Sequence, residues 1–105
     1  DVVLRDRRHL AQDGLVLVVA AIDKETGEIL AGPDVTLRGM AVSEEEEPQF
    51  ADYLRQQVLA ELEELDISEV TDWDAVRSDV RSVVTRAVKQ RLKRRPVIIP
   101  VVMEI

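Results

Sequence analysis

The chain has 105 residues, of which 46% are hydrophobic and 33% charged, and its formal net charge is -7. This size suits one folding unit with a core of its own, and the composition excludes a disordered polymer and a membrane protein. One Trp, one Tyr and one Phe are too few for a base-stacking platform, and the lack of cysteine excludes disulfides and thiolate metal sites.

The first 22 residues divide into a charged segment and an apolar one. Residues 1–14 mix charges with scattered apolar side chains and end in Asp13-Gly14, a turn signal, so we interpret them as a linker or short docking helix. The chain starts without a methionine, and we expect it to be a piece of a longer polypeptide. Residues 15–22 are all apolar and rich in β-branched side chains, which predicts a central strand buried on both faces.

A hairpin is expected next, because residues 23–28 form a polar, glycine-containing turn and residues 29–31 are apolar again. Pro33 lacks the N–H that a strand ladder needs, so Gly32-Pro33-Asp34 should end or bulge this second strand and place it at a sheet edge. Residues 35–42 alternate only weakly and fit either a short strand or an ordered loop.

Two amphipathic helices follow in the sequence. Ser43 and Glu46 form a capping box at the start of the first helix. A helix tolerates proline only in its first turn, so Pro48 indicates that this helix starts near Glu46 or Glu47. Its apolar stripe consists of Phe50, Leu54, Val58, Leu62 and Leu65. The second helix should begin after Thr71 or Asp72 and continue to Leu92. Its stripe consists of Trp73, Val76, Val80, Val83, Ala87 and Val88.

Pro96 stops the second helix, and residues 97–103 form a last apolar strand in which Pro100 demands a gap in the ladder. The order β-β-α-α-β predicts an α+β fold, with a three-stranded sheet and both helices packed on one face. Residues 1–14 are then a linker from another domain, and residues 15–105 are the folded domain.

The opposite face of this sheet is too apolar to be solvated, so we expect it to meet another domain or another copy of the chain. This predicted association surface contains Leu15, Leu17, Val19, Val97, Ile99, Val101 and Met103.

No catalytic or metal-binding residue is predicted. His9 is the only histidine, no HExxH spacing occurs, and no serine stands in a nucleophile-elbow context. The acidic run at residues 44–47 lacks the spacing of a calcium loop and fits a solvated helix start. The glycines form no phosphate-binding pattern, so we expect no cofactor in this chain.

A basic tract near the end of the second helix is the main alternative site. It contains Lys89, Arg91, Lys93, Arg94 and Arg95. Its local field favours contact with an RNA backbone, but cations at a helix C-terminus also serve the helix dipole, form interdomain salt bridges or are simply solvated. The sequence leaves these alternatives open.

Three segments resemble the C-terminal domain of bacterial ribonuclease J. They are LRDRRHLAQDGLVLVV at residues 4–19, AGPDVTLRGM at residues 31–40 and RLKRRPVIIPVVMEI at residues 91–105. Thr71-Asp72-Trp73, at the start of the second helix, is similar to that family as well. No single segment is a catalytic signature, and the resemblance lies in their combination along nearly the whole chain.

The resemblance implies a parent enzyme of the metallo-β-lactamase and β-CASP class, a zinc-dependent ribonuclease with 5′–3′ exonuclease and endonuclease activity in RNA maturation and decay. Its zinc ligands would lie upstream, since no position here matches their motifs. The resemblance also implies a three-stranded domain with two helices that supports self-association, as a dimer or tetramer. The expected partners are a second copy, the enzyme's own catalytic domain and RNA as its substrate, in the cytoplasm and without a membrane.

Overall fold

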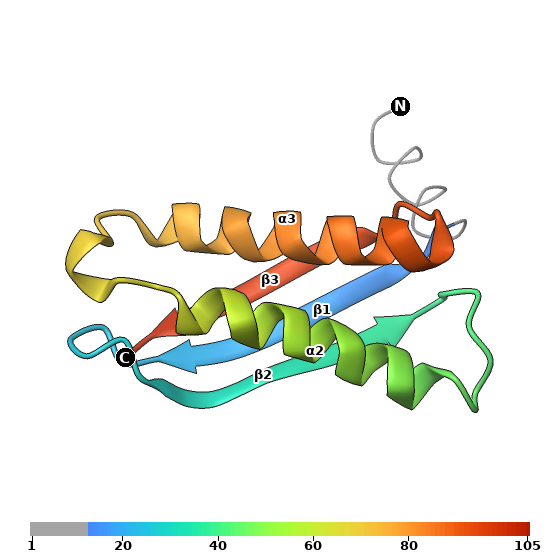
Figure 1. Cartoon of the computed structure of the whole chain (residues 1–105), viewed down its shortest axis with the longest axis horizontal. Helices are drawn as coiled ribbons and strands as arrows, with labels where there is room; N and C mark the ends of the chain where they lie inside the picture. Colours follow the sequence, from blue (N-terminus) through green and yellow to red (C-terminus); the bar gives the residue numbers. More distant parts are fainter. Residues whose placement is uncertain (1–12) are drawn as a thin grey trace.

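The computed structural model describes residues 13–105, in which the chain folds as a sheet of strands covered by helices (Figure 1). The order of the main elements is β-β-α-α-β, which confirms the predicted α+β class. Their bounds are β1 Leu15–Ile22, β2 Ile29–Arg38, α2 Glu47–Glu63, the short 3₁₀ helix η1 Ile67–Glu69, α3 Trp73–Leu92 and β3 Val97–Glu104.

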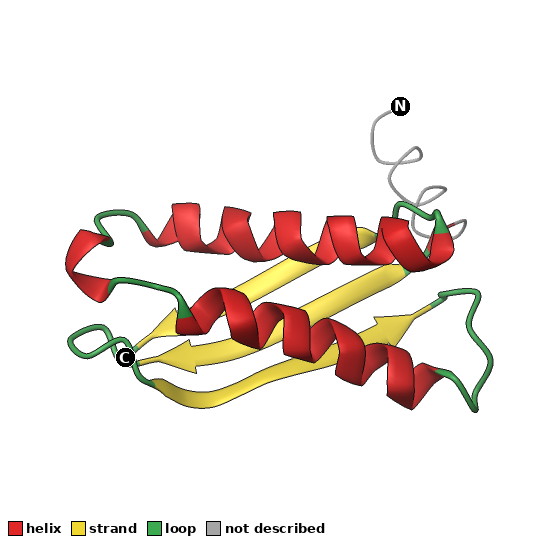
Figure 2. Cartoon of the chain, viewed as in Figure 1, coloured by secondary structure: helices red, strands yellow, loops and turns green. Residues whose placement is uncertain are grey.

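The strands are ordered β2-β1-β3, so the most apolar strand is central, as predicted. β1 pairs antiparallel with β2 through a short turn, and parallel with β3 after the helical crossover. α2 and α3 both lie on one face of this sheet (Figure 2). The prediction of a sheet with helices on one side is therefore confirmed, and the other face is bare of any element from the described part of the chain.

β2 continues past Pro33 to Arg38, so Gly32-Pro33-Asp34 does not end this strand, and the irregular register there fits the predicted alternative, a bulge. The register with β1 shifts on either side of Ala21 and is regular again where Asp34 pairs with Val19. Gly32 allows this course, since it has φ +80° and a Cβ there would lie 2.5 Å from the carbonyl oxygen of Val19. Of residues 35–42, which fit either a strand or a loop by sequence, the part as far as Arg38 therefore belongs to an edge strand.

α2 begins at Glu47 with Pro48 in its first turn, as predicted. Ser43 takes part in the turn before it, where its hydroxyl oxygen accepts a hydrogen bond of 3.2 Å from the backbone N–H of Glu46. The predicted stripe faces the core, with Leu65 only partly buried at its end. The buried members are Phe50, Leu54, Val58 and Leu62.

α3 begins after Asp72, whose carboxylate accepts a hydrogen bond of 2.9 Å from the N–H of Asp74 and caps the helix. Its apolar stripe is buried as expected, with Val84 in addition and Trp73 only partly buried. The helix ends at Leu92, and Lys93 follows in the left-handed conformation with φ 53°. Its N–H donates to the carbonyl oxygen of Lys89.

The core lies between the helices and one face of the sheet. In β1, Val16, Val18 and Ile22 point into this core and are fully or almost fully buried. Leu15 and Leu17 alternate with them and are only half-buried. The prediction that this strand is buried on both faces is therefore wrong for residues 13–105 taken alone, because these residues supply no second layer.

Candidate association surface

All seven residues of the predicted association surface lie on the sheet face opposite the helices. They alternate with core residues along β1 and β3, and the parallel register places them side by side across the two strands. The pairs are Leu15 with Val97, Leu17 with Ile99 and Val19 with Val101, while Met103 pairs with Ala21. The structure thus brings together residues that are more than 75 positions apart in the sequence.

The β3 side of this surface is the more exposed side. Ile99, Val101 and Met103 retain 42%, 37% and 46% of their accessible surface, whereas the β1 residues between the two outer strands are half-buried. Ile105, just beyond the strand, is 61% exposed. Large aliphatic side chains in a continuous row on one face are unusual for a surface that meets only water.

β2 adds a polar border that the sequence reasoning missed. Asp34, Thr36 and Arg38 are exposed and alternate with the inward-facing Pro33, Val35 and Leu37. The signal was present in the period-two pattern of residues 33–38. It was missed because the sequence did not decide whether Gly32-Pro33-Asp34 ends the strand or only bulges it.

The basic tract lies elsewhere, on the last turns of α3 and in the loop before β3. Arg91 stacks on the ring of Tyr53 from α2, with its guanidinium carbon 3.9 Å from the ring centroid. Arg94 lies with Nη1 4.0 Å from a carboxylate oxygen of Asp13. The side chains of Lys89, Lys93 and Arg95 are exposed. Two of the five predicted contact residues are therefore engaged with other parts of the domain.

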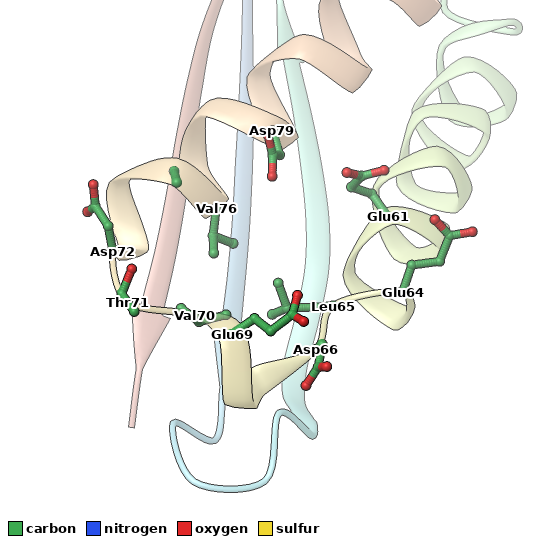
Figure 3. Close-up of a pocket in the computed structure, with 11 residues that line it drawn as sticks. Glu61, Glu64, Leu65, Asp66, Glu69, Val70, Thr71, Asp72, Val76 and Asp79 are labelled. Carbon is green, nitrogen blue, oxygen red and sulfur yellow. The ribbon is translucent and has the colours of Figure 1, made fainter.

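An acidic cleft that the sequence did not predict lies between the end of α2, η1 and the start of α3 (Figure 3). It has a volume of about 360 Å³, and Leu65, Val70 and Val76 contribute apolar lining. Its acidic lining residues are Glu61, Glu64, Asp66, Glu69, Asp72 and Asp79.

Asp66, at the edge of this cleft, has a perturbed carboxylate. The hydroxyl of Ser68 donates a hydrogen bond of 2.6 Å to its Oδ1, and the backbone N–H of Ser68 donates another of 3.0 Å. These two donors, the hydroxyl first, lower the pKa of Asp66 below its ordinary value. Even so, within residues 13–105 no three His, Cys, Asp or Glu side chains are grouped to hold a metal ion.

Two sequence interpretations lie outside the described residues. Both His9 and the linker assigned to residues 1–14, apart from its last two positions, fall in residues 1–12. Gly14 belongs to the folded part, since its carbonyl oxygen accepts a hydrogen bond of 3.0 Å from the N–H of Val97. In the placed part of the chain, no helix is long and apolar enough to cross a membrane.

Comparison with known proteins decides the family. The family model of the ribonuclease J C-terminal domain matches residues 2–105, which is nearly the full length of the chain. The chain belongs to this family. The resemblance read from the three sequence segments and from Thr71-Asp72-Trp73 is therefore confirmed.

Curated relatives of this ribonuclease J C-terminal domain include longer proteins. Ribonuclease J2 of Bacillus subtilis is 32% identical over 108 residues, and Ribonuclease J 2 of Staphylococcus saprophyticus is 33% identical over 106 residues. Ribonuclease J 2 of Staphylococcus aureus strain NCTC 8325 is 34% identical over 108 residues. In each case the match covers 100% of this chain but 19% of the relative, so the chain spans about a fifth of their length.

Proposed function

We propose that this domain is an association and positioning module of an RNA-degrading enzyme, which it assembles by packing the open face of its sheet against a second copy. The observation that supports the proposal most is the continuous aliphatic surface of β1 and β3, to which the helices of the domain contribute no cover. Burying such a surface is favourable wherever a complementary apolar surface is available. The assembly is a dimer, or a tetramer if a further contact joins two dimers.

The chemistry in this proposal belongs to the rest of the enzyme. The parent is a zinc-dependent ribonuclease of the cytoplasm with RNA as its substrate, which cleaves as a 5′–3′ exonuclease and as an endonuclease in RNA maturation and decay. In this proposal the part of the domain that the structure describes supplies neither a zinc ligand nor a reacting group. Its role is to hold catalytic domains in a fixed arrangement, so that the expected partners are a second copy and the enzyme's own catalytic domain.

The size of the sheet sets the expected affinity. Three strands of this length, at the usual spacing between neighbouring strands, form a sheet face of roughly 400 Å². Two such faces bury roughly 800 Å² in total, which is less than the ~1,200–2,000 Å² of stable complexes. The domain alone should therefore associate weakly, and the oligomer should form only at high concentration.

The decisive experiment is the solution mass of the 105-residue chain across a wide concentration range, by sedimentation or light scattering. We expect the mass to rise toward that of a dimer. Ile99→Asp and Val101→Asp place a charge on exposed positions of the open face, so they should return the chain to a monomer without unfolding it. Gln56→Asp, on the exposed side of α2, is the matched control and should leave the association unchanged.

Each alternative outcome has a clear meaning. A monomer at every concentration would contradict packing against a second copy and would leave the catalytic domain as the cover of this face. A dimer that survives both aspartate variants would place the contact on another surface. Circular dichroism of each variant shows whether the fold has been kept.

RNA contact by the basic tract is the alternative function, and the exposure of Lys89, Lys93 and Arg95 supports it. Backbone phosphates would be the ligands, since the domain offers few aromatic rings for stacking. The full-length protein with Lys89→Ala, Lys93→Ala and Arg95→Ala should then bind RNA more weakly, with a smaller dependence of affinity on salt. An unchanged affinity and salt slope would rule out this function for the tract.

A further inference from the structure

On the open face of the sheet, polar and aliphatic residues are arranged in similar rows across the three strands. The register aligns three successive rows with a polar residue on β2, in the order β2, β1, β3, and a fourth, wholly apolar row of Ala31, Ala21 and Met103 lies beyond them. The first row is Arg38, Leu15 and Val97, the middle row is Thr36, Leu17 and Ile99, and the third row is Asp34, Val19 and Val101. Each of these first three rows has one polar residue at the β2 border and two aliphatic residues beside it.

The two outer rows differ mainly in the sign of their border charge. Arg38 stands at one end of the β2 border and Asp34 at the other, four residues apart on the same face of one strand. At the usual rise per residue they are roughly 13 Å apart, which is too far for a direct ion pair within one copy. Among residues 13–105, the Arg38 guanidinium donates a hydrogen bond of 3.3 Å to the carbonyl oxygen of Leu37.

A two-fold axis along the middle row exchanges the outer rows. It would place each strand antiparallel over the same strand of the other copy, with the aliphatic residues of these three rows facing one another and the Met103 row beyond the first row of the other copy. It would also place Asp34 of one copy over Arg38 of the other, and the reverse. Packed sheets lie ~10 Å apart, a gap that the facing side chains of the two borders span together.

Building on the proposed function, we infer that the second copy packs on the open face about a two-fold axis through Thr36, Leu17 and Ile99, with reciprocal Asp34–Arg38 ion pairs between copies. The aliphatic rows supply the burial, and the two ion pairs fix the direction. A two-fold axis along the strands would instead place β2 of one copy over β3 of the other, so Asp34 and Arg38 would face aliphatic side chains without an ion-pair partner, which disfavours it. The charges therefore select one arrangement of an otherwise uniform apolar face.

Charge reversal tests this pairing. Asp34→Arg makes both border positions positive, and Arg38→Asp makes both negative, so each variant alone should self-associate about tenfold more weakly or worse. The double variant Asp34→Arg/Arg38→Asp restores opposite charges across the axis and should recover the dimer. A mixture of the two single variants should form a heterodimer, because each Arg then faces an Asp in the other copy.

Glu63→Arg and Arg86→Asp are matched controls, since they change the net charge by the same amounts at exposed positions of α2 and α3. Neither should weaken self-association, and their mixture should show no preference for the heterodimer. Sedimentation of the single variants, with native mass spectrometry of mixtures whose partners differ in mass, measures both effects.

The outcomes separate this inference from the proposed function. If Ile99→Asp dissociates the dimer while the Asp34 and Arg38 variants associate like the original chain, the dimer uses the apolar surface but does not form the proposed ion pairs. If the double variant fails to recover the dimer, or the control mixture forms heterodimers equally well, the two-fold arrangement is also wrong. If the chain never dimerises, both proposals are overturned.

Discussion

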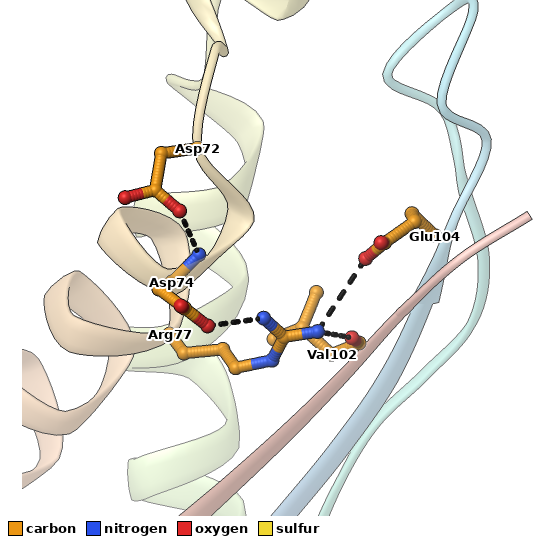
Figure 4. Close-up of polar contacts among 5 residues, drawn as sticks. All are labelled: Asp72, Asp74, Arg77, Val102 and Glu104. Carbon is orange, nitrogen blue, oxygen red and sulfur yellow. Dashed lines mark hydrogen bonds and ion pairs between the residues drawn. The ribbon is translucent and has the colours of Figure 1, made fainter.

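Arg77 of α3 donates a hydrogen bond of 3.0 Å from Nη2 to the carbonyl oxygen of Val102 in β3 (Figure 4). The same guanidinium contacts Asp74 through Nη1 at 2.9 Å and Glu104 through Nη2 at 3.4 Å. One side chain thus ties the start of α3 to the last residues of the edge strand that carries Ile99 and Val101. The position of β3 against the helix layer depends in part on this contact.

Replacing Arg77 by alanine should therefore destabilise the domain by about 1–2 kcal/mol, because the bond to the Val102 carbonyl and its charge assistance are lost. Glu104→Gln should have a smaller effect, since both partners of that ion pair are substantially exposed to solvent. Urea unfolding measures both values, with exposed Arg81→Ala as the control on α3. Equal losses for Arg77→Ala and Arg81→Ala would show that the contact contributes nothing.

Gly32 should be the glycine that tolerates alanine worst in the β1–β2 hairpin. Its φ of +80° is strained for alanine, and the added Cβ would lie 2.5 Å from the backbone oxygen of Val19. Gly27→Ala is the matched control. Gly27 has almost the same φ, 78°, in the turn between β1 and β2, so its variant measures the cost of the backbone conformation alone. We expect Gly27→Ala to reduce the unfolding free energy by about 1–2 kcal/mol and Gly32→Ala to reduce it further. Similar losses would contradict the close approach to Val19.

Lys93→Gly should stabilise the domain by up to about 1 kcal/mol. Lys93 has φ 53° at the end of α3, a conformation in which an L side chain is disfavoured and glycine is not. The hydrogen bond from its N–H to the Lys89 carbonyl does not need the side chain and should remain. Lys89→Gly is the contrasting variant, because the same change inside the helix should be destabilising. Thermal unfolding compares the two.

The helices and the central strand were predictable because local patterns determine them. The stripe from Phe50 to Leu62 has helical spacing, and Pro48 and Asp72 mark helix starts through chemistry within one turn of the chain. The apolar run of β1 has only one plausible place in a small sheet, the centre. These features need no knowledge of distant partners.

The course of β2 was not predictable in the same way. Pro33 and Gly32 both argue against a strand when they are read locally, and only the pairing of Asp34 with Val19 shows that the ladder continues. The polar border of the association surface was therefore missed, although its apolar part was found. The left-handed Lys93 was also missed, since glycine normally marks that position.

The pKa of Asp66 gives a prediction that depends on pH. Because the pKa is lowered in the folded domain, the ionised form is stabilised by folding, mainly through the Ser68 hydroxyl. This contribution is complete above the ordinary aspartate pKa and is lost as the pH falls through the lowered, folded-state value. Ser68→Ala should raise the pKa of Asp66 only part of the way, because the N–H of residue 68 remains as a donor.

Carboxyl NMR titration of Asp66 measures this change directly. The pKa should be unaltered in Ser82→Ala, a variant of an exposed serine on α3. A pKa of Asp66 that is the same with and without the Ser68 hydroxyl would contradict the assigned cause. The stability difference between the original chain and Ser68→Ala should also vanish in strong acid, where Asp66 is protonated in both.

Thr36→Cys should make the two-fold arrangement visible by cross-linking. The chain contains no cysteine, so one substitution introduces a single reactive thiol at an exposed position of β2. If the axis passes through the middle row, the two copies of position 36 face each other, and a bis-maleimide that spans roughly 10 Å fits the usual gap between packed sheets. Thr85→Cys, exposed on α3, is the control and should stay uncross-linked. Equal cross-linking at both positions would mean that random collisions, and not a fixed axis, bring the thiols together.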